Sequence, residues 1–137
     1  SKLDFVESPV HILIGELDDW TPANACLELI EDLKNSDKQF DNINITVYEQ
    51  AHHSFDSKLP VTVIEEGYSF KDCMFELNDE GVPLMNWLNI PMRSPSLQKL
   101  GFSFCADRGP SIGGNKIARE KSFEFSKEFM SKYLLEN

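Results

Sequence analysis

Two acidic residues and two histidines each follow a short apolar run, and together they could carry out acid-base chemistry. Asp18 with Asp19 follows the first run, and His52 with His53 follows the second. A carboxylate beside an imidazole holds the ring in one tautomer, so that the histidine can take a proton from a nucleophile and return it to a leaving group. His53 comes 35 positions after Asp18, about the length of one helix and one strand. This spacing predicts that one crossover brings both side chains to the same edge of a parallel sheet.

The carboxylate that orients the imidazole and the histidine that transfers the proton each have two candidates. Asp18 stands at the first position of the turn after the strand, whereas Asp19 is closer to the next helix, where its charge could face the helix N-terminus. Asp18 is therefore preferred as the acid. Only one of the adjacent histidines, His52 and His53, can face the site from an extended loop, and the other would be a surface neighbour or a hydrogen-bonding neighbour. On the residues alone, a histidine after a strand is more often structural than catalytic.

A predicted strand, helix and strand would position these residues. The apolar run 10–14 is typical of a strand buried on both faces of a parallel sheet. Thr21 as N-cap and Pro22 as first helical residue predict a helix that ends near residues 35–36. Apolar and polar residues then alternate over 43–48, which indicates a second strand. The predicted fold class is α/β, built on a parallel βαβ unit.

The rest of the chain is predicted to be less regular. Four prolines interrupt the pattern from about residue 57 to residue 108, and we interpret residues 57–112 as an irregular excursion with a hairpin around residues 78–81. After the turn at residues 113–115, apolar side chains recur at helical spacing and predict a final helix. With 137 residues, 41% of them hydrophobic, the whole chain is expected to form one domain with a modest core.

Charge and hydropathy narrow the classes of partner. The formal net charge is -10, so a phosphate backbone would be repelled, and nucleic acid is not an expected partner. No apolar run approaches the roughly 20 residues that span a bilayer, and the first residues lack the pattern of a signal peptide. No membrane partner is expected.

The three cysteines have no C-x-x-C spacing, so neither a zinc ribbon nor a thioredoxin-type site is indicated. Cys26 lies in the predicted helix and is expected to be a small buried apolar residue. Cys73 and Cys105 lie in the excursion, where a disulfide between them would restrain a segment with little core of its own. Such a bridge would indicate a periplasmic or secreted protein, and its absence a cytoplasmic one.

Three stretches of the sequence resemble the dienelactone hydrolase family of the α/β-hydrolase superfamily. Residues 8–23 (SPVHILIGELDDWTPA) resemble its acid-bearing segment, and residues 47–56 (VYEQAHHSFD) resemble its histidine segment, in which the histidine directly before Ser-Phe is catalytic. Residues 108–120 resemble the lead into the last helix of longer members, including some with paired cysteines. The resemblance implies that Asp18 and His53 are the catalytic acid and base.

By this resemblance the chain is the C-terminal portion of a partial α/β-hydrolase fold, acting on a small ester or lactone through a Ser (or Cys)-His-Asp triad. No cofactor and no metal are expected. Family members carry the nucleophile on a sharp turn between a strand and a helix upstream of the acid. Only 17 residues precede Asp18, so we expect the chain to supply the acid and the histidine and to be inactive alone. An unpaired strand edge would favour self-association or pairing with the missing N-terminal part.

Other readings of the sequence remain open. The chain could be a non-catalytic binding or assembly module of hydrolase ancestry. Residues 109–113 (GPSIG) fit the pattern G-x-S-x-G around Ser111, although they follow the histidine, and Pro110 restricts the backbone where an elbow must be strained. The adjacent histidines with Asp18 and Asp56 could bind a metal, but the helical H-x-x-x-H spacing of hydrolytic zinc sites is absent.

Overall fold

A computed structural model of the chain describes residues 8–35, 42–85 and 88–135. Its elements in chain order are β1 (Val10–Gly15), α1 (Ala23–Lys34), β2 (Ile43–Tyr48), β3 (Thr62–Val63), β4 (Tyr68–Ser69), β5 (Phe75–Leu77), β6 (Pro83–Met85), β7 (Ile90–Pro91), α2 (Pro95–Phe102), β8 (Asp107–Arg108), β9 (Ser111–Ile112) and α3 (Lys116–Leu134). The described part of the chain is a mixed α/β structure, in agreement with the predicted class.

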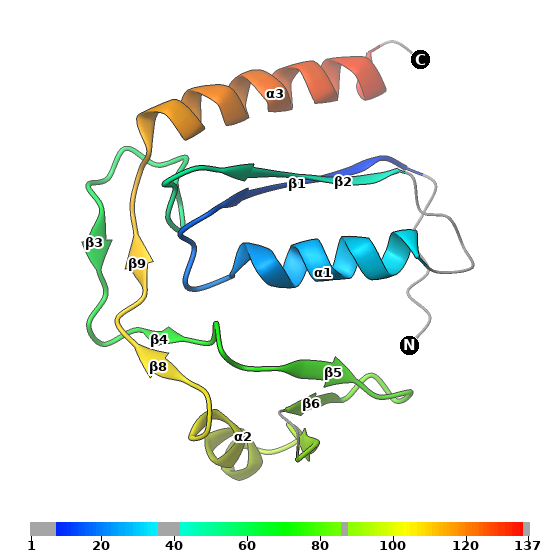
Figure 1. The fold of residues 1–137 in the computed structure, drawn as a ribbon, viewed down its shortest axis with the longest axis vertical. Helices are drawn as coiled ribbons and strands as arrows, with labels where there is room; N and C mark the ends of the chain where they lie inside the picture. The colour runs from blue at the N-terminus through cyan, green and yellow to red at the C-terminus, as the bar shows by residue number, and fades with distance from the viewer. Residues whose placement is uncertain (1–7, 36–41, 86–87, 136–137) are drawn as a thin grey trace.

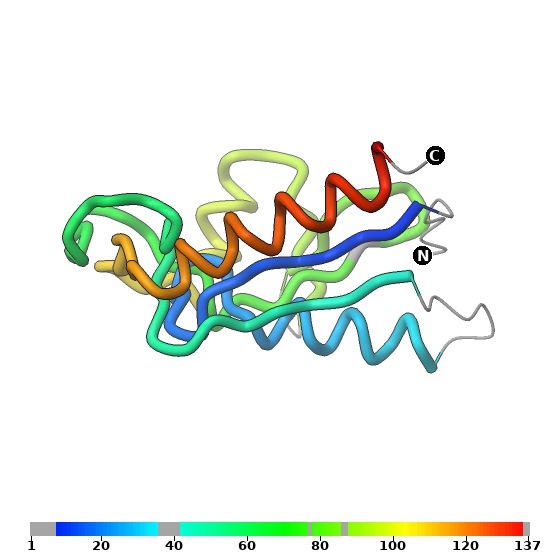
Figure 2. Tube along the Cα trace, turned by 90° about the horizontal axis from the view of Figure 1, so that it is seen from above, coloured from blue at the N-terminus to red at the C-terminus, as the bar shows by residue number. Residues whose placement is uncertain are grey.

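The centre of the molecule is the predicted strand, helix and strand. β1 and β2 pair in parallel, in a register that runs from Val10 opposite Ile43 to Gly15 opposite Tyr48. In Figure 1, α1 lies on one side of this pair and α3 on the other, and Figure 2 shows the same elements from above. Residues 10–15 and 43–48 therefore form strands as predicted, and the last helix also follows the turn at 113–115 as predicted.

Alternation along the two strands produces one apolar cluster on each face of the sheet. The cluster toward α1 has Ile30, Leu33 and Ile43 at its centre, with Val10, Ile12 and Ile45 packed against it. The cluster toward α3 has Tyr48, Ala51 and Ala118 at its centre, with Leu13 and Phe55 packed against it. Because β1 and β2 run parallel, both end at the same edge of the sheet, and the candidate site lies at that edge.

The start of α1 differs from the prediction in one respect. Pro22 is the N-cap, without a side-chain cap hydrogen bond, so Thr21 is not the cap and Pro22 is not the first helical residue. The Thr21 hydroxyl donates instead to Oδ2 of Asp18, at 2.9 Å. A buried carboxylate requires donors more strongly than an exposed helix end does, because water can satisfy the latter. At the other end Asn35 is the C-cap, and Ser36 lies outside the described residues.

The excursion is more regular than the sequence predicted. Its outgoing and returning limbs pair with each other, β3 with β9 and β4 with β8, both antiparallel. Beyond these pairs lie the sheet β5-β6-β7 and helix α2 (Figure 1). The hairpin predicted around residues 78–81 is present between β5 and β6, where Gly81 has a φ of 73° and its N–H donates to the Asn78 carbonyl at 2.9 Å.

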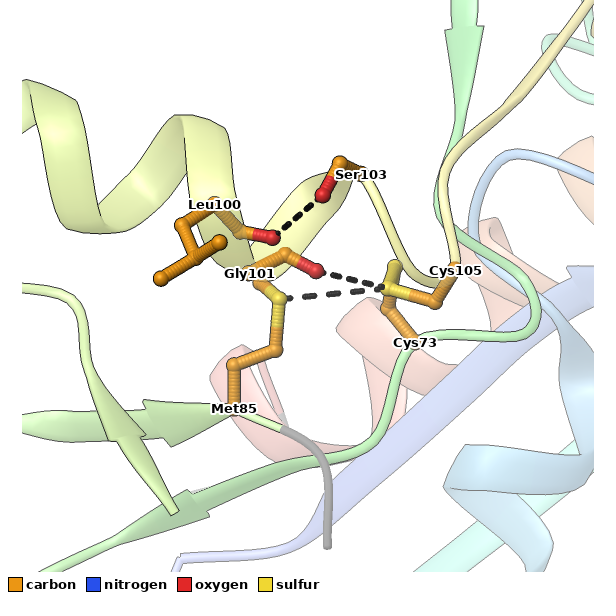
Figure 3. The surroundings of a disulfide bond; sticks show 6 residues. All are labelled: Cys73, Met85, Leu100, Gly101, Ser103 and Cys105. Atoms are coloured by element: carbon orange, nitrogen blue, oxygen red, sulfur yellow. Dashed lines mark hydrogen bonds between the residues drawn. A yellow bond between two sulfur atoms is a disulfide. The ribbon is translucent and has the colours of Figure 1, made fainter. Parts of the chain in front are cut away.

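The predicted disulfide joins Cys73 to Cys105, with the two Cα atoms 5.0 Å apart (Figure 3). Sγ of Cys105 lies 3.8 Å from the Met85 sulfur and 3.8 Å from the Gly101 carbonyl oxygen. Met85 is fully buried, so the bridge packs against a small core of its own between β6 and α2. Cys26 is half-buried and has a free thiol. Among the described residues, no helix combines the length and the apolar character needed to cross a bilayer.

The stability of the fold should depend on pH through His11 on β1. Its ring lies 4.3 Å from that of Phe125 on α3, and its Nε2 lies 2.8 Å from Oγ1 of Thr46. Burial lowers the pKa of His11 from 6.5. The unfolded chain therefore binds more protons than the folded chain just below pH 6.5, so stability is lost as the pH falls through this range.

We expect thermal unfolding to show this loss as a fall in Tm between pH 7.5 and pH 5.5, part of which is specific to His11. The His11→Gln variant cannot titrate at this position, so its Tm should fall less over the same interval. The comparison is needed because the chain contains two other histidines, His52 and His53. Equal pH dependence in both proteins would show that His11 contributes nothing.

Candidate functional site

The acid turn, residues 16–21, links β1 to α1 and surrounds the carboxylate of Asp18 with donors. Oδ1 accepts hydrogen bonds from the backbone N–H groups of Trp20 at 3.0 Å and Thr21 at 2.8 Å. Oδ2 accepts one from the Thr21 hydroxyl. Asp18 is only 8% exposed, so these bonds replace the water that its carboxylate lost on burial. The turn therefore holds Asp18 in one orientation.

The histidine loop, residues 49–57, follows β2 and runs beside the acid turn. Parallel pairing continues past the ends of the strands, since the N–H of Glu16 donates to the Tyr48 carbonyl and the N–H of Leu17 donates to the Ala51 carbonyl, both at 2.9 Å. Backbone hydrogen bonds thus join the acid turn and the histidine loop just before Asp18 in one segment and His53 in the other.

The structure brings Asp18 and His53 into direct contact. Nδ1 of His53 lies 3.0 Å from Oδ2 and 3.2 Å from Oδ1 of Asp18. A carboxylate can only accept, so Nδ1 carries the ring proton and Nε2 is the basic nitrogen. The edge of the ring also contacts Trp20, at 5.1 Å between centroids.

Exposure differs sharply between the two partners of this pair. The side chain of Asp18 is 6% exposed and that of His53 is 34% exposed. Among the described residues, every hydrogen bond of the His53 ring is made through Nδ1, with Asp18 and with Thr21 Oγ1 at 3.3 Å. A buried acid therefore orients a histidine whose other nitrogen is available to a reacting group, which is the arrangement of a general base.

The alternative candidates, Asp19 and His52, form a second network. Oδ1 of Asp19 accepts hydrogen bonds from the backbone N–H of Ser111 at 2.8 Å and from its hydroxyl at 3.1 Å. Nδ1 of His52 lies 2.7 Å from the same hydroxyl oxygen. Asp19 thus contacts β9 rather than the start of α1, and His52 is a hydrogen-bonding neighbour of the site.

Ser111 does not have the geometry of a nucleophile. It lies in β9, opposite Val63 of β3, and not in a sharp turn between a strand and a helix. Its single hydroxyl proton is donated to Asp19, so the oxygen must accept from His52 and gains no base. Its N–H is bonded to Asp19 as well. The segment 109–113 therefore matches the G-x-S-x-G pattern without its structure.

Sequence reasoning missed the residues that close this site from the excursion. The hydroxyl of Ser69 donates to the Asp19 carbonyl, and the N–H of Gly113 donates to the His53 carbonyl at 2.9 Å. The sequence signal for Gly113 is the pair Gly113-Gly114 before the last helix. In the structure a Cβ at residue 113 would lie 2.4 Å from Cα of Val61, and the φ of Gly113 is 150°. No pattern in the sequence pointed to Ser69.

Within the described ranges, no group of three or more His, Cys, Asp and Glu side chains is placed to hold a metal ion. The contact between Asp18 and His53 can by itself support acid-base chemistry, with Asp18 orienting the ring and Nε2 of His53 taking up or releasing a proton. Comparison of the chain with protein-family models, with curated proteins and with solved structures gives no match.

Proposed function

We propose that this chain supplies the acid and the base of a hydrolase of the dienelactone hydrolase type, which cleaves a small ester or lactone. The observation that carries the proposal is the 3.0 Å contact between Nδ1 of His53 and the buried carboxylate of Asp18, at the end of two parallel strands. The order of strand, acid, helix, strand and histidine supports assigning these elements to the C-terminal part of an α/β-hydrolase fold.

In the proposed reaction, a Ser or Cys side chain contributed by a segment upstream of Ser1 attacks the carbonyl carbon. Nε2 of His53 takes the proton of the attacking group, and Asp18 stabilises the imidazolium through Nδ1–H. The tetrahedral intermediate then collapses, the ester C–O bond breaks, and His53 returns the proton to the leaving alkoxide. Water deprotonated by the same nitrogen attacks the acyl-enzyme and releases the carboxylic acid with the free nucleophile.

The compartment and the partners follow from other features. The disulfide between Cys73 and Cys105 favours a periplasmic or secreted protein over a cytoplasmic one. Among the described residues the sheet of β1 and β2 has no third strand, and in the proposed fold its unpaired edge meets the rest of the sheet, which the upstream segment would provide. Without that segment, the same edge favours self-association of the chain.

The test is to read the coding sequence upstream of Ser1 and to express the protein that includes it. We expect an upstream strand, nucleophile turn and helix, hydrolysis of p-nitrophenyl acetate, and, where the nucleophile is a serine, labelling of that residue by a fluorophosphonate. Residues 1–137 alone should show neither activity nor labelling. A start codon directly before Ser1 would contradict the proposal and support a non-catalytic module, and labelling of Ser111 would support a self-sufficient hydrolase instead.

A further inference from the structure

Among the described residues that lie outside both loops, Ser111 is the one whose side chain hydrogen bonds to the acid turn and to the histidine loop. It donates its N–H and its hydroxyl proton to Asp19, 92 positions away, and accepts from Nδ1 of His52. Two further backbone contacts of the same segment reach the histidine loop, since the N–H of Gly113 donates to the His53 carbonyl and Ile112 forms a parallel bridge with His53.

The segment that carries Ser111 is itself firmly held. Pro110 is fully buried, and its carbonyl accepts the N–H of Ile64 at 2.9 Å. Gly113 is buried against the backbone of Val61, as the 2.4 Å distance of a hypothetical Cβ shows. The packing of its neighbours therefore holds Ser111 in place, where it hydrogen bonds to residues of both loops.

Adjacent pairs of like residues create an ambiguity of pairing at this site. Two aspartates face two histidines, and either carboxylate could in principle bond either ring. The hydroxyl of Ser111 hydrogen bonds to both Asp19 and His52. Asp18 is then the carboxylate that bonds His53.

We propose that Ser111 is a positioning residue: by hydrogen bonding to Asp19 and His52, it determines which carboxylate pairs with which histidine and thereby holds Asp18 against His53. The proposal rests on the proposed function, in which that contact orients the base. Backbone bonds after the ends of β1 and β2 join the two loops directly, and the segment 111–113 joins them through Asp19, His52 and His53. Both connections involve residues next to Asp18 or His53 in the chain, so loss of either one should loosen the contact between them.

The experiment measures the Nδ1–H proton of His53 by NMR in the chain of residues 1–137, both its chemical shift and its exchange rate with water. The Asp18→Asn variant identifies the signal, because it removes the charged acceptor. In Ser111→Ala we expect exchange to be at least about fivefold faster, which corresponds to the loss of one hydrogen bond of about 1 kcal/mol. Ser111→Thr keeps a hydroxyl on a strand and should restore the wild-type rate.

A matched control separates positioning from general stability. Ser122 on α3 is 5% exposed, and its hydroxyl donates to the Arg119 carbonyl at 2.9 Å, away from the site. Ser122→Ala should lower stability by a comparable amount and leave the exchange of the His53 proton unchanged. If Ser111→Ala does not fold, His52→Ala removes the other end of the link and should speed exchange in the same direction.

Unchanged exchange of the His53 proton in Ser111→Ala, or in His52→Ala where that variant replaces it, would overturn the proposal. So would equal acceleration in Ser122→Ala. These outcomes are independent of the proposed function, because none of them requires hydrolysis. If the longer protein hydrolyses no ester while the His53 proton responds as expected, the positioning role stands and the hydrolase assignment fails.

Discussion

Replacing His53 with alanine in the protein that includes the upstream segment is expected to lower kcat/KM for p-nitrophenyl acetate by about 10⁴-fold or more. The reason is that, in the proposed reaction, Nε2 of His53 takes the nucleophile's proton and returns it to the leaving group. Among the described side chains, no other histidine contacts Asp18. The loss should lie in kcat, because the ring acts on the reacting atoms and not on substrate binding. Steady-state kinetics on the purified variant measure both parameters.

The neighbouring histidine provides the matched control. His52→Ala removes an imidazole at the adjacent position but no atom of the contact between Asp18 and His53. We therefore expect a loss of about tenfold or less, the value for one missing hydrogen bond that supports this contact. Asp18→Asn should cost about 10⁴-fold, since the amide favours the wrong tautomer of His53. A larger loss in His52→Ala than in His53→Ala would assign the base to the other ring and contradict the site described above.

The features that could be predicted from the sequence are those that depend on residues close together in the chain. The apolar run before Gly15, the helical spacing after it and the alternation over 43–48 each carry a local signal, and the parallel crossover rule then places Asp18 near His53. The proximity of Asp18 and His53 could therefore be predicted without knowing the structure of the excursion. The pairing of Cys73 with Cys105 was predictable for a similar reason, because these two cysteines share one segment of low core content.

The features that were missed depend on contacts between distant positions. The bond between Asp19 and Ser111 spans 92 residues, and the pairs β3-β9 and β4-β8 join the two limbs of the excursion. Two-residue strands carry no periodicity, so only their tertiary partners define them. Thr21 was assigned as a helix cap for a related reason, since its local sequence favours a cap and only burial of Asp18 redirects its hydroxyl.

Gly15, the last residue of β1, should be the most sensitive position of the fold around the site. A Cβ at this position would lie 2.2 Å from the carbonyl oxygen of Ala51, 2.7 Å from its carbonyl carbon and 3.0 Å from the carbonyl oxygen of His52. These are backbone atoms, so no side-chain rotation can relieve the overlap, and the histidine loop itself must move by about an ångström to reach ordinary contact distance. That shift would break the bond between the Leu17 N–H and the Ala51 carbonyl.

We expect Gly15→Ala to lower the free energy of unfolding by about 4 kcal/mol or more, because a forced backbone displacement in a packed region belongs with the largest effects of single substitutions. Against a total of about 5–15 kcal/mol, this leaves little folded protein, and urea unfolding followed by circular dichroism measures it. Gly81→Ala is the matched control, since its Cβ would meet open space and its φ of +73° alone should cost about 1–2 kcal/mol. Equal losses in the two variants would mean that the histidine loop can yield at Ala51, and then the close approach of the two loops would not be what holds Asp18 against His53.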